Sequence, residues 1–196
     1  MYLGGEFTTL GGVSHPRLGA VNRDTGAEIA TFDPAVSSGN VIRVDVQGDV
    51  VYFGGTFGMV NGSTRNNAAA VRIAPGMPVD GELLAWNPNV GGPVYDIDAF
   101  GEVVYLAGGF GSVGGSSRPG IAMVDADVAT GAVRSWRPVD LSGGSVSVID
   151  TSATAVLFGG LLRDLNHIDI GAVLYPEANL PGTPPPPTTP DVVVRG

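Results

Sequence analysis

A short glycine motif occurs four times along the chain at a nearly constant spacing. The copies read YLGGEF, YFGGTF, YLAGGF and, in degenerate form, LFGGLL, and they begin at Tyr2, Tyr52, Tyr105 and Leu157. A period of about 50 residues is the signature of a repeat architecture, in which each repeat is a supersecondary unit that packs against its neighbours. The repeats divide residues 1–175 into four units, at about 1–40, 41–93, 94–145 and 146–175.

The third unit shows the strand pattern most clearly. It contains four β-favouring segments, at residues 94–99, 102–107, 121–125 and 132–136, separated by Gly-containing turns and loops. No apolar stripe of helical period is long enough to indicate a helix. Four short strands in about 50 residues are typical of one β-propeller blade. We expect an all-β fold, a propeller of four-stranded antiparallel blades, with about three and a half blades in this chain.

Each of the first three units ends its fourth strand on an aromatic residue followed two positions later by proline. The residues are Phe32, Trp86 and Trp136, in the sequences FDP, WNP and WRP. The proline ends the ladder pairing, and the aromatic ring is expected to fill the gap between neighbouring blades. The alternative is that the two tryptophans are stacking platforms for sugars.

The glycine pairs of the motif have a structural and a functional interpretation. Gly54-Gly55 and Gly108-Gly109 can let a strand bend or another backbone approach closely. A phosphate-binding loop would instead require a strand that leads into a helix N-terminus, and here the glycines lead to more strand. The pattern favours the structural interpretation.

The combined motifs resemble a known family. The best match is YLAGGF at 105–110, GGSSR at 114–118, Thr130-Gly131 and WRP at 136–138. This pattern resembles the bacterial delta-sixty repeat propellers and is more distantly similar to kelch and galactose-oxidase-like propellers. The resemblance implies an extracellular or cell-surface repeat protein without an assigned chemistry. Units one and four depart from it, since unit one has Phe32 in place of tryptophan and unit four lacks the motif tyrosine and the loop arginine.

Composition excludes several classes of protein. The net charge of −9 disfavours binding to nucleic acids, and no polybasic cluster favours an anionic membrane. No apolar run reaches the roughly 18 residues of a transmembrane helix. The absence of cysteine excludes disulfides and thiolate-bound zinc. No signal peptide is expected, because Met1 leads directly into a motif, and a chain that starts within a motif is expected to be a fragment of a larger propeller.

The last part of the chain has a different character. Residues 176–196 contain four consecutive prolines, at 184–187, flanked by threonines. Such a composition predicts an extended, semi-rigid linker or tail. A ligand for proline-recognition domains is the alternative.

Two sets of charged residues each recur in three of the four units. Arg17, Arg65 and Arg118 follow the glycine motif in the same loop, and Asp45, Asp98 and Asp150 each lie four residues beyond the valine of their first strand. The arginines are expected to anchor strands through carbonyls or carboxylates, or alternatively to form an anion-binding ring. The aspartates can cap turns, pair with the arginines or coordinate Ca²⁺.

Other candidate sites are weaker. Asp125 and Asp127 alternate before a turn glycine, which allows Ca²⁺ binding, but the spacing of a calcium loop is absent. His15 and His167 are the only histidines, and no triad or HExxH motif accompanies them. No catalytic residue, and no cofactor apart from the possible Ca²⁺, is assigned.

These observations favour a non-catalytic scaffold or binding module that holds a protein or carbohydrate ligand with loops on one face. One alternative is a carbohydrate-active hydrolase or lyase with acids on different blades, which an acid pair at non-repeating positions would support. Another is a structural subunit that self-assembles through open blade edges.

Overall fold

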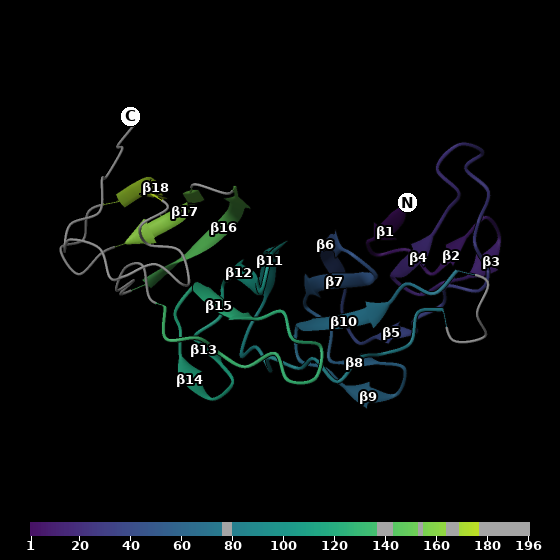
Figure 1. The fold of residues 1–196 in the computed structure, drawn as a ribbon, viewed down its shortest axis with the longest axis horizontal. Coiled ribbons are helices and arrows are strands. Elements are labelled where there is room, and N and C mark those ends of the chain that lie inside the picture. Colours follow the sequence, from purple (N-terminus) through teal and green to yellow (C-terminus); the bar gives the residue numbers. More distant parts are fainter. Residues whose placement is uncertain (76–79, 137–142, 153–154, 164–168, 177–196) are drawn as a thin grey trace.

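A computed structural model describes residues 1–75, 80–136, 143–152, 155–163 and 169–176. Every regular element in these ranges is a β-strand, which confirms the expected all-β class. The sheets of the four units follow one another in chain order along the long axis of the molecule, from the N-terminal unit to β16–β18 (Figure 1).

Units two to four each contain a three-stranded antiparallel sheet with the second strand in the middle. Unit one has only the second and third strands of this arrangement, and its chain begins in the second strand. The first, second and third strands are β6 (Val41–Gln47), β7 (Val50–Gly55) and β10 (Ala68–Arg72) in unit two, β11 (Val94–Phe100), β12 (Val103–Gly108) and β15 (Ile121–Asp125) in unit three, β16 (Gly143–Thr151), β17 (Ala155–Arg163) and β18 (Asp169–Pro176) in unit four, and β1 (Tyr2–Gly4) and β4 (Leu18–Ala20) in unit one.

The expected fourth strands are much shorter than the sequence predicts. In units one to three the fourth segment joins the third strand through a single bridge, Val21↔Glu28, Val71↔Leu83 or Val124↔Val133. Around the bridge in unit two, the N–H of Leu84 donates to the carbonyl of Ala70. The prediction of full four-stranded sheets was therefore too generous, because the pairing ends within a few residues on either side of each bridge.

The Gly/Ser-rich loop of each of the first three units is a small hairpin, whereas the sequence predicts only a loop there. Each hairpin turns on two residues with positive φ, such as Asn61 (48°) and Gly62 (74°) in unit two. Two residues with positive φ form the tight turn that matches strand twist, and Asn-Gly is its preferred sequence. The paired strands are β2 (Thr9–Leu10) with β3 (Val13–Ser14), β8 (Met59–Val60) with β9 (Ser63–Thr64), to which β5 (Val36–Ser37) adds, and β13 (Ser112–Val113) with β14 (Ser116–Ser117).

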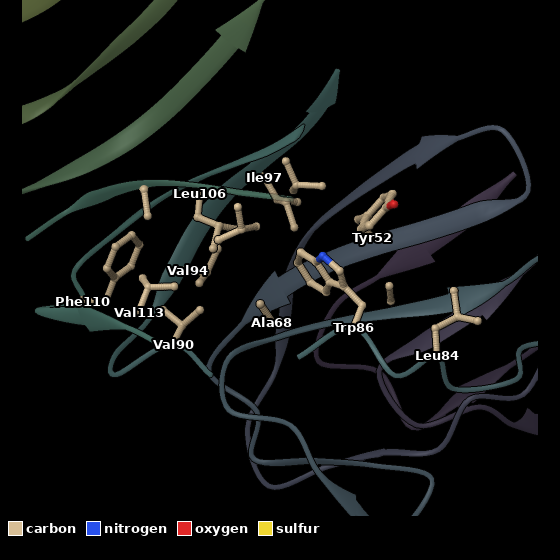
Figure 2. Packing of buried hydrophobic residues seen from close by; sticks show 14 of the residues in the cluster. Tyr52, Ala68, Leu84, Trp86, Val90, Val94, Ile97, Leu106, Phe110 and Val113 are labelled. Atoms are coloured by element: carbon tan, nitrogen blue, oxygen red, sulfur yellow. The ribbon is translucent and has the colours of Figure 1, made fainter. Parts of the chain in front are cut away.

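The hydrophobic cores lie between neighbouring units. Along β7, Val50 and Tyr52 pack toward unit three, whereas Val51 and Phe53 pack toward unit one. Alternate residues of a strand point to opposite faces, so a sheet with neighbours on both sides is apolar at every position. The same alternation in β15 and β12 separates the core shared by units two and three (Figure 2) from the core shared by units three and four.

The array of sheets is open among the described residues. No strand of unit one pairs with a strand of unit four in the described ranges. The expected linker falls outside the described residues except for Pro176, which ends β18. His167 and the Arg137-Pro138 end of the WRP motif also lie outside them.

Candidate functional site

The residues that recur in each unit gather at the boundaries between units. Trp86 is fully buried between units two and three, and its indole N–H donates to the backbone carbonyl of Asp125 in unit three (2.8 Å). The ring meets Tyr52 edge-on at 5.2 Å between centroids, and the Tyr52 hydroxyl donates to the carbonyl of Ala126 (2.9 Å). Figure 2 shows the indole beside Tyr52 within the shared core. Trp86 therefore fills the gap between two units and offers no stacking face to a sugar.

Trp136 occupies the equivalent place beside unit four but is less enclosed. It meets Tyr105 edge-on at 5.4 Å and packs, partly buried, against the core shared with unit four. Burial, with a smaller contribution from the charge of Asp98, raises the pKa of Tyr105 to about 12. In the first unit Phe32 is fully buried against Tyr2.

The fourth position of the motif is a glycine that accommodates a bulge in the first strand. The register of the first strand shifts just after Val41, Val94 and Val146, which pair with Gly55, Gly108 and Gly160. A Cβ on Gly55 would lie 2.0 Å from the carbonyl oxygen of Asn40, and one on Gly108 would lie 2.1 Å from that of Pro93. Only glycine lets the two backbones approach this closely.

The two glycine pairs of the sequence are offset by one residue. The N–H groups of Gly55 and Gly108 donate to the carbonyls of Asn67 and Gly120, each two positions beyond the loop arginine. Gly55 and Gly108 are therefore equivalent, so Gly109 corresponds to Thr56 and Ala107 corresponds to Gly54. A Cβ on Gly54 would lie 2.4 Å from Cγ1 of Val94 in the next unit. Packing between units therefore limits the side chain at the position of Gly54, where unit three has alanine. The bulge requires glycine at the position of Gly55.

Arg65 and Arg118 anchor the hairpin to the fourth segment of their own unit. The Arg65 guanidinium donates to the carbonyls of Thr64 and Leu84, and that of Arg118 donates to the carbonyls of Ser117 and Arg134. Burial lowers the pKa of Arg65. Neither guanidinium contacts the recurring aspartates, and a fork that donates to two carbonyls is a structural anchor.

Arg17 lies in the same loop but two positions beyond the anchor. Its backbone has the left-handed φ of 68° and the hydrogen bonds found at Asn67 and Gly120, and its side chain donates to the carbonyl of Val36 (3.0 Å). The residue of unit one that corresponds to Arg65 and Arg118 is His15.

His15 is fully buried and lies between two carboxylates. Its Nε2 is 2.6 Å from Oε1 of Glu28, and its Nδ1 is 3.5 Å from Oδ1 of Asp33. Glu28 replaces the aliphatic residue that forms the fourth-segment bridge in units two and three. The two substitutions therefore act together: His15 replaces the loop arginine, and Glu28 bonds to its imidazole.

Asp45, Asp98 and Asp150 form a row across neighbouring first strands. The N–H of Ala99 in unit three donates to Oδ2 of Asp45 in unit two (2.7 Å), and Asp98 contacts Thr151 of unit four in the same way. Burial, reinforced by the charges of Asp45 and Asp150, raises the pKa of Asp98 against the opposing effect of the hydrogen bond from Thr151. Each bonded aspartate thus ties the first strand of its unit to the first strand of the next.

Asp96 is a buried acid that lies outside the residues predicted from the sequence. Its Oδ1 is 2.8 Å from Nε of Arg43 in unit two, and its Oδ2 accepts the N–H of Ile149 in unit four (2.9 Å). One carboxylate therefore joins three consecutive units. Arginine and valine occupy its position in units two and four, so no repeat pattern marked it.

Asp125 and Asp127 have local partners. Asp125 forms an ion pair with Arg134, and Asp127 accepts the N–H of Ala129 (3.0 Å) in a turn. Among the described residues, no group of three or more His, Asp or Glu side chains is arranged to hold a metal ion.

An open groove of about 550 Å³ lies along the fourth segment of unit two. Its lining combines acidic, amide and hydroxyl side chains with one cation and short apolar residues. The polar residues are Asp33, Asn61, Ser63, Arg65, Asp80 and Glu82. Three of them are acids at positions that do not recur, and since Asp33 belongs to unit one, the groove lies where unit one meets unit two.

The comparisons with known proteins identify no relative. No family model matches the chain, and neither a curated protein nor a solved structure matches it significantly. In the described part of the chain, no helix has the length and apolarity needed to cross a membrane.

Proposed function

We propose that this chain is a non-catalytic repeat scaffold, an arc of β-propeller-type blades from an exported or cell-surface protein. The carrying observation is the use of the recurring residues: Trp86, Tyr52 and Asp45 bond across unit boundaries, and Arg65 anchors its own unit. Stacked sheets with cores between them and first strands side by side support the blade arrangement. The resemblance to delta-sixty repeat propellers supports the exported location.

The ligand surface we assign to this scaffold is the groove along the fourth segment of unit two. Asp33 and Glu82 give it acceptors for hydroxyl groups, while Asp80 already accepts the N–H of Ala74, and the charge of the three acids disfavours anions. A neutral carbohydrate fits this lining, with Asn61 and Ser63 as further polar partners. Two of the lining residues also join units one and two, since Asn61 accepts the N–H of Ala35 and Asp80 accepts the hydroxyl of Thr31.

The alternative of a carbohydrate-active enzyme rests on the same groove, because its acids occupy non-repeating positions. The buried acid Asp96 does not support that alternative, since Arg43 and the N–H of Ile149 take its two oxygens. Asp98, whose pKa is raised, belongs to the repeated row of aspartates and contacts Thr151.

The test is a titration of the ¹⁵N-labelled chain with neutral oligosaccharides, followed by mass spectrometry of the sugars after a day. We expect amide shifts at Asn61, Ser63 and Gly81 with the sugars intact. Cleavage products that disappear in Asp33→Asn or Asp80→Asn would contradict the scaffold and establish an enzyme.

A further inference from the structure

A buried histidine lies behind one of the acids that line the groove. Asp33 has a half-exposed side chain in the groove, and Oδ1 of this carboxylate is 3.5 Å from Nδ1 of His15. His15 is fully buried, and its Nε2 is 2.6 Å from Oε1 of the mostly buried Glu28. The three side chains therefore form a series of contacts that runs from the interior of unit one, through the imidazole, to the groove.

The repeat makes the chemistry of this position unusual. The residues equivalent to His15 in units two and three are Arg65 and Arg118, whose guanidinium groups donate to the carbonyls of Leu84 and Arg134. A guanidinium keeps its charge throughout the physiological pH range, whereas an imidazole changes its charge between about pH 5 and 8. Unit one therefore has a titratable group at a position where two other units have a permanent cation.

The hydrogen bonding of a neutral His15 is incomplete. A neutral imidazole has one N–H, and the short contact of Nε2 with Glu28 places it there. Nδ1 is then an acceptor that faces the carboxylate of Asp33, which is also an acceptor, and this buried nitrogen has no hydrogen-bond partner among the described residues. Only the imidazolium, which has an N–H on both nitrogens, bonds to both carboxylates at once.

The cations nearest to this series in the chain and in the groove are bonded elsewhere. Within the described ranges, the charged groups that face the imidazole are Glu28 at Nε2 and Asp33 at Nδ1. Arg17, two residues further along the chain, donates to the carbonyl of Val36. Arg65, the cation of the groove lining, donates to two backbone carbonyls. The charge of the imidazole therefore decides whether the Asp33 carboxylate is paired.

We propose that His15 is a proton-sensitive positioning residue for Asp33 and thereby controls how strongly the groove binds its ligand. The imidazolium bonds to Asp33 and draws this carboxylate toward unit one, whereas the neutral imidazole leaves it free to accept a hydroxyl group of the ligand. Affinity in the groove therefore rises with pH as His15 loses its proton, and a bound ligand reciprocally favours the neutral imidazole. The effect on affinity rests on the carbohydrate binding proposed above, but the control of Asp33 does not.

The first test needs no ligand. Long-range ¹H–¹⁵N spectra of the full chain follow the imidazole between about pH 5 and 8, and His15→Gln assigns its signals, since the chain has one other histidine. In Asp33→Asn the imidazole should lose its proton at a lower pH than in wild type, because a negative charge beside Nδ1 is removed. Asp24→Asn, at an exposed aspartate of the same unit, is the matched control and should leave the titration unchanged. Identical titration curves for wild type and Asp33→Asn would overturn the proposal.

The second test measures the affinity of the full chain for two neutral sugars, cellohexaose and maltohexaose. Wild type and His167→Gln should bind at least about fivefold more tightly at pH 8 than at pH 5, whereas His15→Gln and Asp33→Asn should lose this dependence. Circular dichroism verifies that the variants are folded. Equal affinity of wild type at both pH values, or a dependence that persists in His15→Gln, would overturn the proposal. If neither sugar binds at either pH while the imidazole responds to Asp33→Asn, the carbohydrate function fails and the control of Asp33 by His15 is supported.

Discussion

The boundary between units two and three differs from the boundary between units three and four, although both use the same repeat positions. At the first, Trp86 is fully buried, and both its indole and the Tyr52 hydroxyl donate to carbonyls across the boundary. At the second, Trp136 is only partly buried. There Asp96 accepts the N–H of Ile149, and the same carboxylate pairs with the more exposed Arg43 across the first boundary.

The difference shows that one repeat pattern can be stabilised in two ways. An aromatic ring that is wholly removed from water contributes through apolar burial and packing. A buried carboxylate that bonds to a cation and to N–H donors matters for stability mainly because its removal leaves those partners unsatisfied. Loss of side-chain volume at the aromatic ring should therefore cost more at the first boundary, whereas loss of the Asp96 carboxylate should weaken both boundaries.

The largest expected effect is at Trp86. Trp86→Ala should lower the free energy of unfolding by about 3–5 kcal/mol, the usual cost of truncating a buried aromatic residue. Trp136→Ala should cost about half as much, because part of its ring is exposed. Urea unfolding followed by circular dichroism measures both, and an equal or larger loss at Trp136 would remove the proposed distinction.

Asp96 should come next. Asp96→Ala removes the acceptor of the Ile149 N–H and the partner of Arg43, which should cost about 2 kcal/mol. The Arg43 side chain is 59% exposed, so Arg43→Ala should cost less than about 1 kcal/mol. If the two variants lose the same stability in urea unfolding, the carboxylate acts only through the ion pair and does not tie unit four.

A smaller effect is expected at the bulge. Gly108→Ala places a methyl group against the carbonyl of Pro93 and should cost about 1–2 kcal/mol through overpacking. Gly111→Ala, in open space, should change stability by no more than about 0.5 kcal/mol. Thermal melts of the two variants distinguish these outcomes, and a neutral Gly108→Ala would show that the bulge can relax.

The smallest effect is a pH dependence at Asp98. Its pKa in the folded protein is raised above the ordinary 3.8, mainly by burial, so the folded state binds more protons than the unfolded state in this range. The contribution of Asp98 to stability therefore falls as pH rises from about 3.8 through its folded pKa. Asp98→Asn should gain stability relative to wild type between pH 3.5 and 7. A constant difference across this range would contradict the raised pKa.

Much of the architecture is predictable because it depends on local patterns that recur. The strand segments at 94–99, 102–107 and 121–125 agree with β11, β12 and β15, and the register of Trp86 predicts its place between units. The need for glycine at Gly55 and Gly108 also follows from the strand context, although the bulge that causes it is visible only in the pairing.

The remaining features depend on contacts distant in sequence. The sequence pattern groups Arg17 with the other loop arginines. The backbone hydrogen bonds show instead that His15 is equivalent to Arg65 and Arg118, because all three N–H groups donate to the residue that follows the motif phenylalanine. The pairing of His15 with Glu28 could have been suspected from an acid at an otherwise aliphatic position. Asp96 carries no such signal, because its partners come from units on both sides.

The central claim is that the recurring aromatic residues join neighbouring units, and a ¹⁵N-edited NOE spectrum tests it most directly at Trp86. The indole N–H of Trp86 donates to the carbonyl of Asp125, 39 residues away in the sequence. We predict strong NOEs from this proton to protons of Asp125 and Ala126, in the neighbouring unit. An indole proton without these NOEs, resonating as in an unfolded chain, would contradict the account.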